Sequence, residues 1–159
     1  MEWLVNTLIW LPAIVIGLTF HEYAHGRVAC WLGDDTPYYQ GRLTLNPLPH
    51  IDWVGFLMLL LFKFGWAKPV EVNPYNFKNC GVKQGMMLVS LAGPVMNLLL
   101  ALAGMFILKY SGMDQHSGFY LYSHNSVRML VEPLVYINLI LAVFNLIPVP
   151  PLDGSKILA

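Results

Sequence analysis

The sequence predicts a mainly α-helical, polytopic membrane protein with three full spanning helices, one shorter helix and short β-strands near the functional site. Hydrophobic residues make up 57% of the 159 residues and charged residues only 11%, whereas an average soluble domain has about 25% charged residues. The 9 basic and 9 acidic residues cancel, which argues against a disordered chain and against nucleic-acid binding through net charge. We therefore expect a single integral-membrane domain, residues 1–159, surrounded by the lipid bilayer.

Three uncharged stretches predict the spanning helices, because a bilayer core about 30 Å thick needs about 20 mostly apolar residues. They are residues 3–20, 84–108 and 133–152. A fourth apolar run, Trp53 to Phe62, contains only ten uncharged residues and is too short to cross the bilayer. We expect it to form a re-entrant or interfacial helix, or one packed against the other helices.

Prolines mark each of the three spans. Pro12 is expected to kink the first, Gly93-Pro94 to interrupt the second, and the cluster from Pro148 to Pro151 to unwind the end of the third. Broken backbone at membrane depth is tolerated only where it is buried in protein or lines a wet cavity. The prolines therefore suggest an internal site, although a simple packing kink remains open for Pro12.

Two extended segments separate the spans. Residues 41–47 are expected to form a short strand that ends in a turn, and residues 66–74 another, confined to a sheet edge by its prolines. The chain stops at 155–159, where a new helix is expected to begin, so we expect the domain to be truncated at its C-terminus. No basic residue precedes the first apolar run, so a cleaved signal peptide is not expected.

The residues from His21 to His25 have the pattern H-E-x-x-H, which is expected to close the first apolar helix. Residues at i and i+4 share one helix face, so both imidazoles can bind one zinc ion while Glu22 takes a proton from the attacking water. The alternative is a satisfied polar cluster at a helix end, but ionisable residues in a membrane segment are functional candidates by default. A catalytic zinc usually has three protein ligands. Asp153, after the proline cluster, is the candidate for the third, and an ordinary helix N-cap is its alternative.

His21–His25, followed far downstream by Asn145–Gly154, resembles the site-2 protease family of intramembrane zinc metalloproteases. The matching segments between them are similar to the compact bacterial and archaeal branch that lacks a PDZ domain: 41–46, 50–52, 65–70 and 93–97. Two positions depart from that pattern, since Trp53 and Glu71 stand where proline is expected.

The resemblance implies one zinc ion per chain, with His21, His25 and Asp153 as ligands and Glu22 as the catalytic base. Asn145 would hold the substrate carbonyl or its oxyanion, as a second catalytic residue. Asn97 would support the site. The residues expected to contact substrate are Asn97, Trp66, Ala67, Lys68, Val70 and Val72.

The spans and the charges also predict an orientation. From Trp3 to His21 the helix rises about 27 Å, which takes the metal site near the far face of the membrane. If Asp153 binds the same ion, the last span ends on that face and residues 32–80 leave and return on it. Seven basic residues fall on this side, against Lys109 and Arg128 on the other: Arg27, Arg42, Lys63, Lys68, Lys78, Lys83 and Lys156. The positive-inside rule then makes the metal side cytoplasmic, in the plasma membrane.

The predicted function is an intramembrane zinc endopeptidase that cleaves within or near transmembrane helices of protein substrates, with access controlled by a regulatory membrane partner of unknown identity. A substrate helix must unwind, and the extended segment 66–73, with 42–46, would accept it by strand addition. One alternative is an HtpX-like membrane zinc protease, whose third ligand would be a late glutamate, here Glu132 on the opposite face. The other is a non-catalytic membrane binding or transport protein that holds zinc, which would not need Glu22.

The remaining polar residues are expected to have lesser roles. His50 and Asp52 are candidates for a second metal site, but a hydrogen-bonded turn is favoured. His116 and His124 are expected in a solvated loop on the opposite side. Cys30 and Cys80 are expected to be plain thiols on the reducing side.

Overall fold

The structure is a computed structural model that describes residues 2–62, 64–111 and 118–158, with side chains described over 7–62, 64–111 and 127–157. It is mainly helical. Three long helices make up most of it. The connection between the first two of them contains two short α-helices and the 3₁₀ turns Leu48–His50 and Pro74–Asn76. The helices are α1 (Glu2–Leu32), α2 (Thr36–Tyr39), α3 (Trp53–Phe62), α4 (Val82–Ser111), α5 (Gly118–Asn145) and α6 (Asp153–Leu158).

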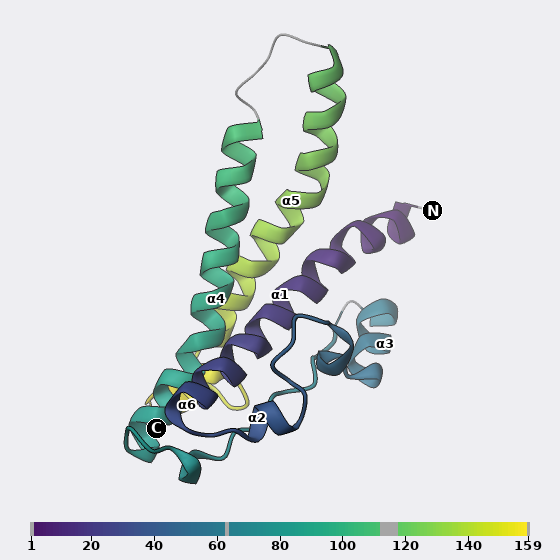
Figure 1. Ribbon diagram of the computed structural model, residues 1–159. Helices are drawn as coiled ribbons and strands as arrows, with labels where there is room; N and C mark the ends of the chain where they lie inside the picture. Colours follow the sequence, from purple (N-terminus) through teal and green to yellow (C-terminus); the bar gives the residue numbers. More distant parts are fainter. Residues whose placement is uncertain (1, 63, 112–117, 159) are drawn as a thin grey trace.

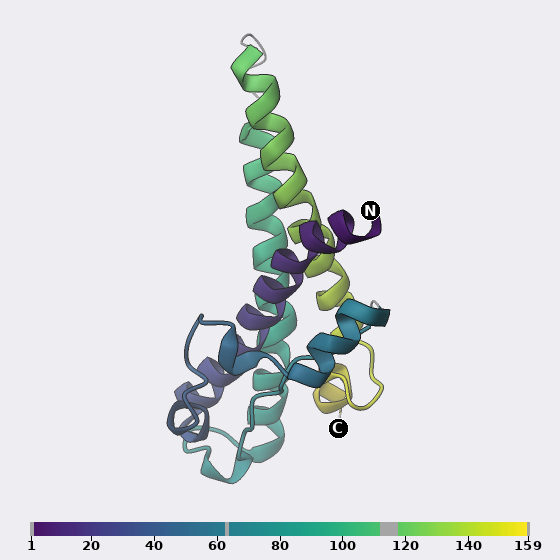
Figure 2. The same ribbon diagram turned by 90° about the vertical axis from the view of Figure 1, so that its right-hand side faces the viewer.

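The long helices α4 and α5 lie side by side and run in opposite directions, and α1 crosses them obliquely (Figures 1 and 2). Short helix α6 packs against the start of α4, close to the last part of α1. The ends of α1 and α5 and the start of α4 therefore meet at one end of the molecule. The connecting segments between residues 33 and 81 gather beside this end.

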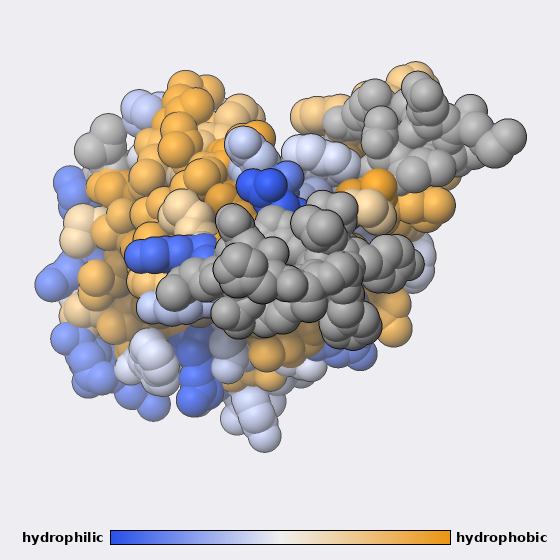
Figure 3. Space-filling view, turned by 90° about the horizontal axis from the view of Figure 1, so that it is seen from above, coloured by the Kyte–Doolittle hydropathy of each residue, from blue (hydrophilic) through white to orange (hydrophobic). Residues whose placement is uncertain are grey.

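Each long helix is apolar and long enough to cross a bilayer, over Thr7–Leu32, Val82–Ser111 and Val127–Asn145. The buried apolar residues are mostly small, such as Ala29, Ala101 and Ala142, whereas large ones such as Phe106 are exposed. Small residues let helices approach closely inside lipid, which the large side chains then face. Figure 3 shows apolar residues over much of the visible face. The prediction of a helical protein with three spans is confirmed, and the short apolar run forms α3 as expected.

The third span lies earlier in the chain than predicted. It ends at Asn145, before the proline cluster, and extends back through Pro133 to Gly118. The three prolines deny the 146–152 segment the amide donors of a helix, which is why the span stops there. His124, expected in a loop, falls within α5, and His116 lies outside the described residues. Pro12 and Pro94 lie inside α1 and α4 without ending either helix.

Helix α1 does not end at the H-E-x-x-H pattern, which corrects the expectation that the pattern closes the helix. It continues to Leu32 because nothing before Gly33 breaks it. Gly33 adopts φ of +109°, and the N–H groups of Gly33 and Asp34 donate to the carbonyls of Cys30 and Ala29. A glycine with positive φ is a common helix stop. His21 consequently lies about 16 Å before the end of α1, deeper in the span than expected.

The predicted β-strands are not formed in the parts of the chain that the structure describes. A single antiparallel bridge joins Ile51 to Ala67. Side chains form hydrogen bonds with backbone groups that would otherwise pair with a neighbouring strand. The Arg42 guanidinium donates to the carbonyls of Lys68 (2.5 Å) and Pro69 (2.7 Å). The N–H of Val70 donates to the Glu22 carboxylate at 2.8 Å. The segment 66–74 is therefore extended but held by side chains.

Candidate metal centre

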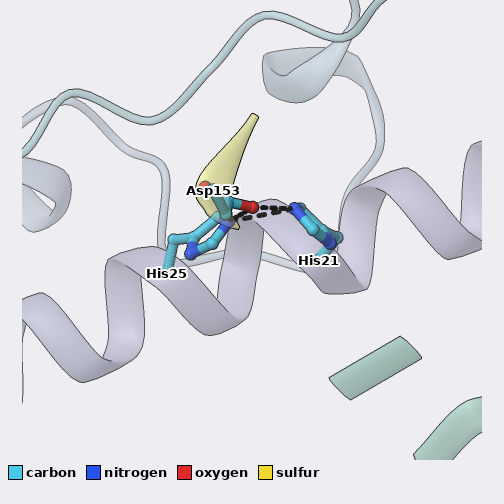
Figure 4. Close-up of side chains that lie close together, drawn as sticks. All are labelled: His21, His25 and Asp153. Carbon is cyan, nitrogen blue, oxygen red and sulfur yellow. Dashed lines mark hydrogen bonds and ion pairs between the residues drawn. The ribbon is translucent and has the colours of Figure 1, made fainter. Parts of the chain in front are cut away.

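The two histidines and Asp153 meet at one point (Figure 4). His21 and His25 project from one face of α1, and Asp153 is the first residue of α6. Asp153 Oδ2 lies 3.1 Å from Nε2 of His21 and 3.1 Å from Nε2 of His25, and the two Nε2 atoms are 2.9 Å apart. All three residues are buried. Residues 132 positions apart in the chain thus form one cluster.

Asp153 reaches the histidines because α6 turns back closely against the end of α5. A Cβ atom on Gly154 would lie 2.4 Å from the carbonyl oxygens of Leu146 and Ile147. Only glycine fits so close to this backbone. The proline segment between Asn145 and Asp153 is non-helical, as the sequence predicts, and this allows the reversal.

The outer nitrogen of each ring is oriented by a second helix. Nδ1 of His25 lies 2.7 Å from the carbonyl oxygen of Val89, and Nδ1 of His21 lies 2.5 Å from Oδ1 of Asn97. A carbonyl only accepts, so His25 carries its proton on Nδ1. Partners of this kind fix the tautomer of metal-binding histidines.

The inner donor atoms fit a metal ion by their chemistry. With the Nδ1 atoms protonated, both Nε2 atoms present lone pairs to each other and to the Asp153 carboxylate. In neutral rings these three atoms are electron-rich and lie 2.9–3.1 Å apart, an arrangement that a bound cation would stabilise. Nitrogen ligands of a tetrahedral zinc lie about 3.3 Å from each other, since each Zn–N bond is about 2.0–2.1 Å. The donor set therefore suits zinc.

Helix α4 packs against the two histidine rings at Gly93. A Cβ atom at this position would lie 2.5 Å from Nε2 of His25 and 2.5 Å from Cε1 of His21. Real Cβ atoms do not approach other atoms so closely, so a side chain here would displace both rings. Glycine allows the backbone of α4 to pack directly against the two histidine rings.

The cluster opens into a cavity of about 210 Å³. Glu22 lines it beside the two histidines, and its Oε2 is held by the N–H of Val70. The other lining residues come from the 66–74 segment, α4, and the end of α5 and the start of α6: Pro69, Val70, Val72, Met86, Val89, Ser90, Asn145, Pro151, Asp153 and Lys156. A carboxylate next to a metal site and a cavity that can admit water is the arrangement that a hydrolytic site needs.

The two asparagines of the predicted site differ in position. Asn145 lines the cavity, and its Nδ2 donates one N–H to the Leu141 carbonyl at 2.9 Å, which leaves the second N–H of this amide for a substrate. Asn97 is completely buried behind His21. In this conformation it supports the site and has no exposed surface for a substrate.

The predicted substrate-binding segment lies along the cavity. Val70 and Val72 face it, whereas Lys68 and Glu71 line a separate hollow beside Arg42. Side chains that point alternately to two sides in this way are typical of an extended chain. Trp66 is nearly half exposed and packs on α3, where a Cβ on Gly55 would lie 2.3 Å from the Trp66 carbonyl. Ala67 forms the bridge to Ile51.

Two charged residues that position this segment were not predicted as parts of the site. Arg42 is buried, and its guanidinium binds the carbonyls of Pro49, Lys68 and Pro69; burial lowers its pKa. Asp34 is buried beyond the end of α1 and accepts from the Asn73 N–H (2.7 Å) and from Nδ2 of Asn76 (2.8 Å). Burial alone would raise the pKa of Asp34, but hydrogen bonds from the Thr36 hydroxyl, Asn76 and Asn73 outweigh it and lower the pKa. Apart from Pro49, which is 7 residues from Arg42, these partners lie 26 to 42 residues away in the chain, so no local pattern could identify them.

The other candidate residues have local roles. Asp52 accepts from the N–H groups of Val54 and Gly55 at the start of α3, and Nε2 of His50 lies 2.9 Å from the Thr44 carbonyl. These contacts fit the favoured turn. Among the described residues, the metal-ligand cluster found is that of His21, His25 and Asp153, which does not include His50 or Asp52. Cys30 and Cys80 are free thiols, as expected.

Glu132, the third ligand of the HtpX-like alternative, is about half exposed and pairs with Arg128 at 3.2 Å within α5. Three spanning-capable helices around a buried histidine–histidine–carboxylate cluster define a polytopic membrane protein with a metal-dependent hydrolytic site.

Comparisons with known proteins agree. Residues 120–159 match the profile of peptidase family M50. The chain is 42% identical to YwhC of Bacillus subtilis, over 99% of this chain and 68% of that protein. It is 29% identical to MJ0611 of Methanocaldococcus jannaschii, over 95% of this chain and 69% of that protein. It is 30% identical to Rip2 of Mycobacterium tuberculosis, over 88% of this chain and 52% of that protein.

All three relatives are named as putative zinc metalloproteases. No solved structure matches the chain. The chain belongs to peptidase family M50, the site-2 protease family. It is a zinc metalloendopeptidase, its cofactor is zinc, and it is a multi-pass membrane protein.

Proposed function

We propose that this chain is an intramembrane protease that cleaves membrane-protein substrates within or near their transmembrane segments. The observation that carries the proposal is the position of the His21–His25–Asp153 cluster and Glu22. His21, Glu22 and His25 lie in α1, a helix that can span a bilayer, about 10–16 Å before its end, and Asp153 reaches them from the start of α6. A peptide bond must therefore enter the membrane-spanning part of the protein to reach them.

In this proposal His21, His25 and Asp153 hold one zinc ion per chain. Zinc at such a site supplies a Lewis acid that polarises the scissile carbonyl and lowers the pKa of water. Glu22 takes the proton of the attacking water through its free oxygen, because Oε2 is restrained by the Val70 N–H, and passes the proton to the leaving amine. Asn145, through the amide N–H that the Leu141 carbonyl does not use, donates to the carbonyl oxygen of the substrate.

Substrate would bind along the segment from Trp66 to Asn73. Among the described residues, the carbonyl of Val70 and the N–H of Val72 make no hydrogen bond, so both are available to an added strand. A helical substrate hides its peptide bonds in its own hydrogen bonds and must unwind first. Glycine in a helix costs about 1 kcal/mol relative to alanine, so weak helix formers near the cleavage site would help.

We place the metal site toward the cytoplasmic side of the plasma membrane. The support is the excess of basic residues on the side where α1 ends, α4 begins and α6 lies. Residues 1–159 act in this proposal as one domain, with a transmembrane substrate as partner and access governed by a regulatory membrane protein of unknown identity.

The test is cleavage of a purified single-span substrate in detergent or liposomes by wild-type protein and by Glu22→Gln. Glutamine keeps the size and can still contact the Val70 N–H through its oxygen, but it cannot act as a base. Loss of general-base catalysis costs about 10²–10⁴-fold, so we expect cleavage to fall by that range while zinc content is unchanged. A zinc chelator must abolish wild-type cleavage. Normal turnover by zinc-loaded Glu22→Gln would overturn the mechanism.

A further inference from the structure

Behind the metal site, a row of buried polar side chains connects all three long helices. His21 on α1 contacts Asn97 on α4 at 2.5 Å, and Asn97 contacts Asn138 on α5 at 2.7 Å. Both asparagines are completely buried. Unsatisfied polar groups in an apolar interior cost roughly 1–3 kcal/mol by mutational data, so such a row is retained only when its hydrogen bonds are complete.

Two backbone carbonyls fix the direction of every hydrogen bond in this row. Asn138 Nδ2 donates to the Leu134 carbonyl at 2.8 Å, so Asn138 Oδ1 faces Asn97 and accepts from it. Asn97 Nδ2 also donates to the Gly17 carbonyl at 3.1 Å, so Asn97 Oδ1 faces His21. Because this oxygen only accepts, His21 must carry its proton on Nδ1. Nε2 of His21 is left with its lone pair, directed at His25 and Asp153.

We propose that Asn138 is a positioning residue for zinc: it acts through Asn97 to hold His21 in the metal-binding tautomer and orientation. The inference rests on the proposed zinc site. It gives α5 an indirect link to His21, through Asn97, that is separate from the Asn145–Asp153 region at its end. Without Asn138, one N–H of Asn97 has no acceptor, and the Asn97 amide is held by the Gly17 carbonyl alone.

The packing around Asn138 supports a fixed side-chain position. A Cβ atom on Gly17 would lie 3.2 Å from Asn138 Oδ1 and 3.1 Å from Leu141 Cδ1. These distances are tighter than ordinary contacts, so α1 and α5 meet closely at this level. The amide of Asn138 is therefore confined between Gly17, Asn97 and its own helix.

The experiment measures zinc affinity of the purified protein in detergent, by competition with a chromophoric chelator. The variants are Asn138→Leu, Asn97→Leu, the double variant, and His21→Ala. Ile140→Ala is the matched control, since Ile140 lies two positions away on α5 and is 57% exposed. The visible spectrum of the cobalt-substituted protein reports the ligand geometry without any need for activity.

Loss of a group that orients a metal ligand typically weakens binding by about 10–100-fold. We expect Asn138→Leu to weaken zinc binding about tenfold and Asn97→Leu at least as much, both with an altered cobalt spectrum. Since Asn138 acts through Asn97, the double variant should bind zinc within about threefold of Asn97→Leu. Ile140→Ala should match wild type.

Two results would overturn the inference: unchanged zinc affinity and spectrum in folded Asn138→Leu, or a full additive loss in the double variant. If Asn138→Leu does not fold, Asn138→Asp decides. A neutral carboxyl can accept from Asn97 and donate to Leu134, so it should keep affinity within about threefold of wild type. A loss of about tenfold or more counts against the relay. Equal zinc binding by wild type and His21→Ala would instead refute the proposed metal site.

Discussion

Asp153 has its proposed role because it begins α6 and its carboxylate contacts both imidazoles at 3.1 Å. We predict that Asp153→Ala loses zinc more severely than the roughly 10–100-fold expected for an orienting group, because a ligand itself is removed. Equilibrium dialysis with metal analysis is the measurement. Asp35→Ala, at an exposed aspartate, is the control and should retain zinc. Retention of wild-type affinity in Asp153→Ala would remove Asp153 from the ligand set.

Gly93 is the second residue whose role is steric and specific. We predict that Gly93→Ala lowers zinc affinity and cleavage together, because its Cβ would stand 2.5 Å from His25 Nε2 and must displace a ligand or α4. Gly81→Ala provides the comparison, since a Cβ there meets nothing within 4 Å. Chelator competition on both variants is the check. Equal affinities would show that α4 can shift away without disturbing the site.

At the scale of elements, the segment 66–74 is placed by side chains of other elements. Arg42 holds its start, Asp34 holds its end, and Glu22 binds Val70 between them. A proline at Val70 would therefore also remove the contact to Glu22. A proline at Val72 is the cleaner test of strand addition, because its N–H is unpaired among the described residues.

We predict that Arg42→Ala reduces cleavage while zinc stays bound, because the carbonyls of Pro49, Lys68 and Pro69 lose their donors. These contacts are only partly buried, so water can replace the lost donors, but nothing then holds the start of the segment and it should loosen. Limited proteolysis at Glu71 with a glutamate-specific protease measures this directly. Arg27→Ala, at an exposed arginine, should leave both proteolysis and cleavage unchanged. Wild-type protection of Glu71 in Arg42→Ala would contradict the prediction.

For the whole molecule, the antiparallel α4 and α5 and the crossing α1 bring the metal site and the 33–81 segments to the same end. Lys83 and Lys109 lie near opposite ends of α4, so this helix separates the two faces. The proposed orientation puts the end with Lys83 in the cytoplasm.

A membrane-impermeant thiol reagent applied to intact cells tests this orientation. In a Cys30→Ser background, we expect Cys80 to be protected and a cysteine at Tyr110, which is 64% exposed at the far end of α4, to be labelled. Both should react after the membrane is permeabilised. The reverse pattern in intact cells would invert the topology.

The sequence alone determined the class of protein and the candidate metal ligands. A long uncharged run predicts a membrane span without any knowledge of how the helices pack. The i, i+4 spacing places His21 and His25 on one face through helix geometry alone. Asp153 was a candidate because zinc needs a third ligand and the proline cluster precedes it, whereas Asn145 came from resemblance to a family. Only the fold brings Asp153 into contact with the histidines. The H-E-x-x-H pattern did not end its helix, because the stop signal, Gly33, lies eight residues after His25.

Only the tertiary structure decided how the site is supported. Asn97 contacts His21 across 76 residues, Asn138 contacts Asn97 across 41, and Val70 contacts Glu22 across 48. The same long-range contacts explain why the extended segments did not pair as strands, since Arg42 and Glu22 occupy backbone groups that a strand would use. Local patterns report which face of a helix is apolar. They do not report which distant donor a buried carbonyl or amide will meet, because packing of the whole chain decides that.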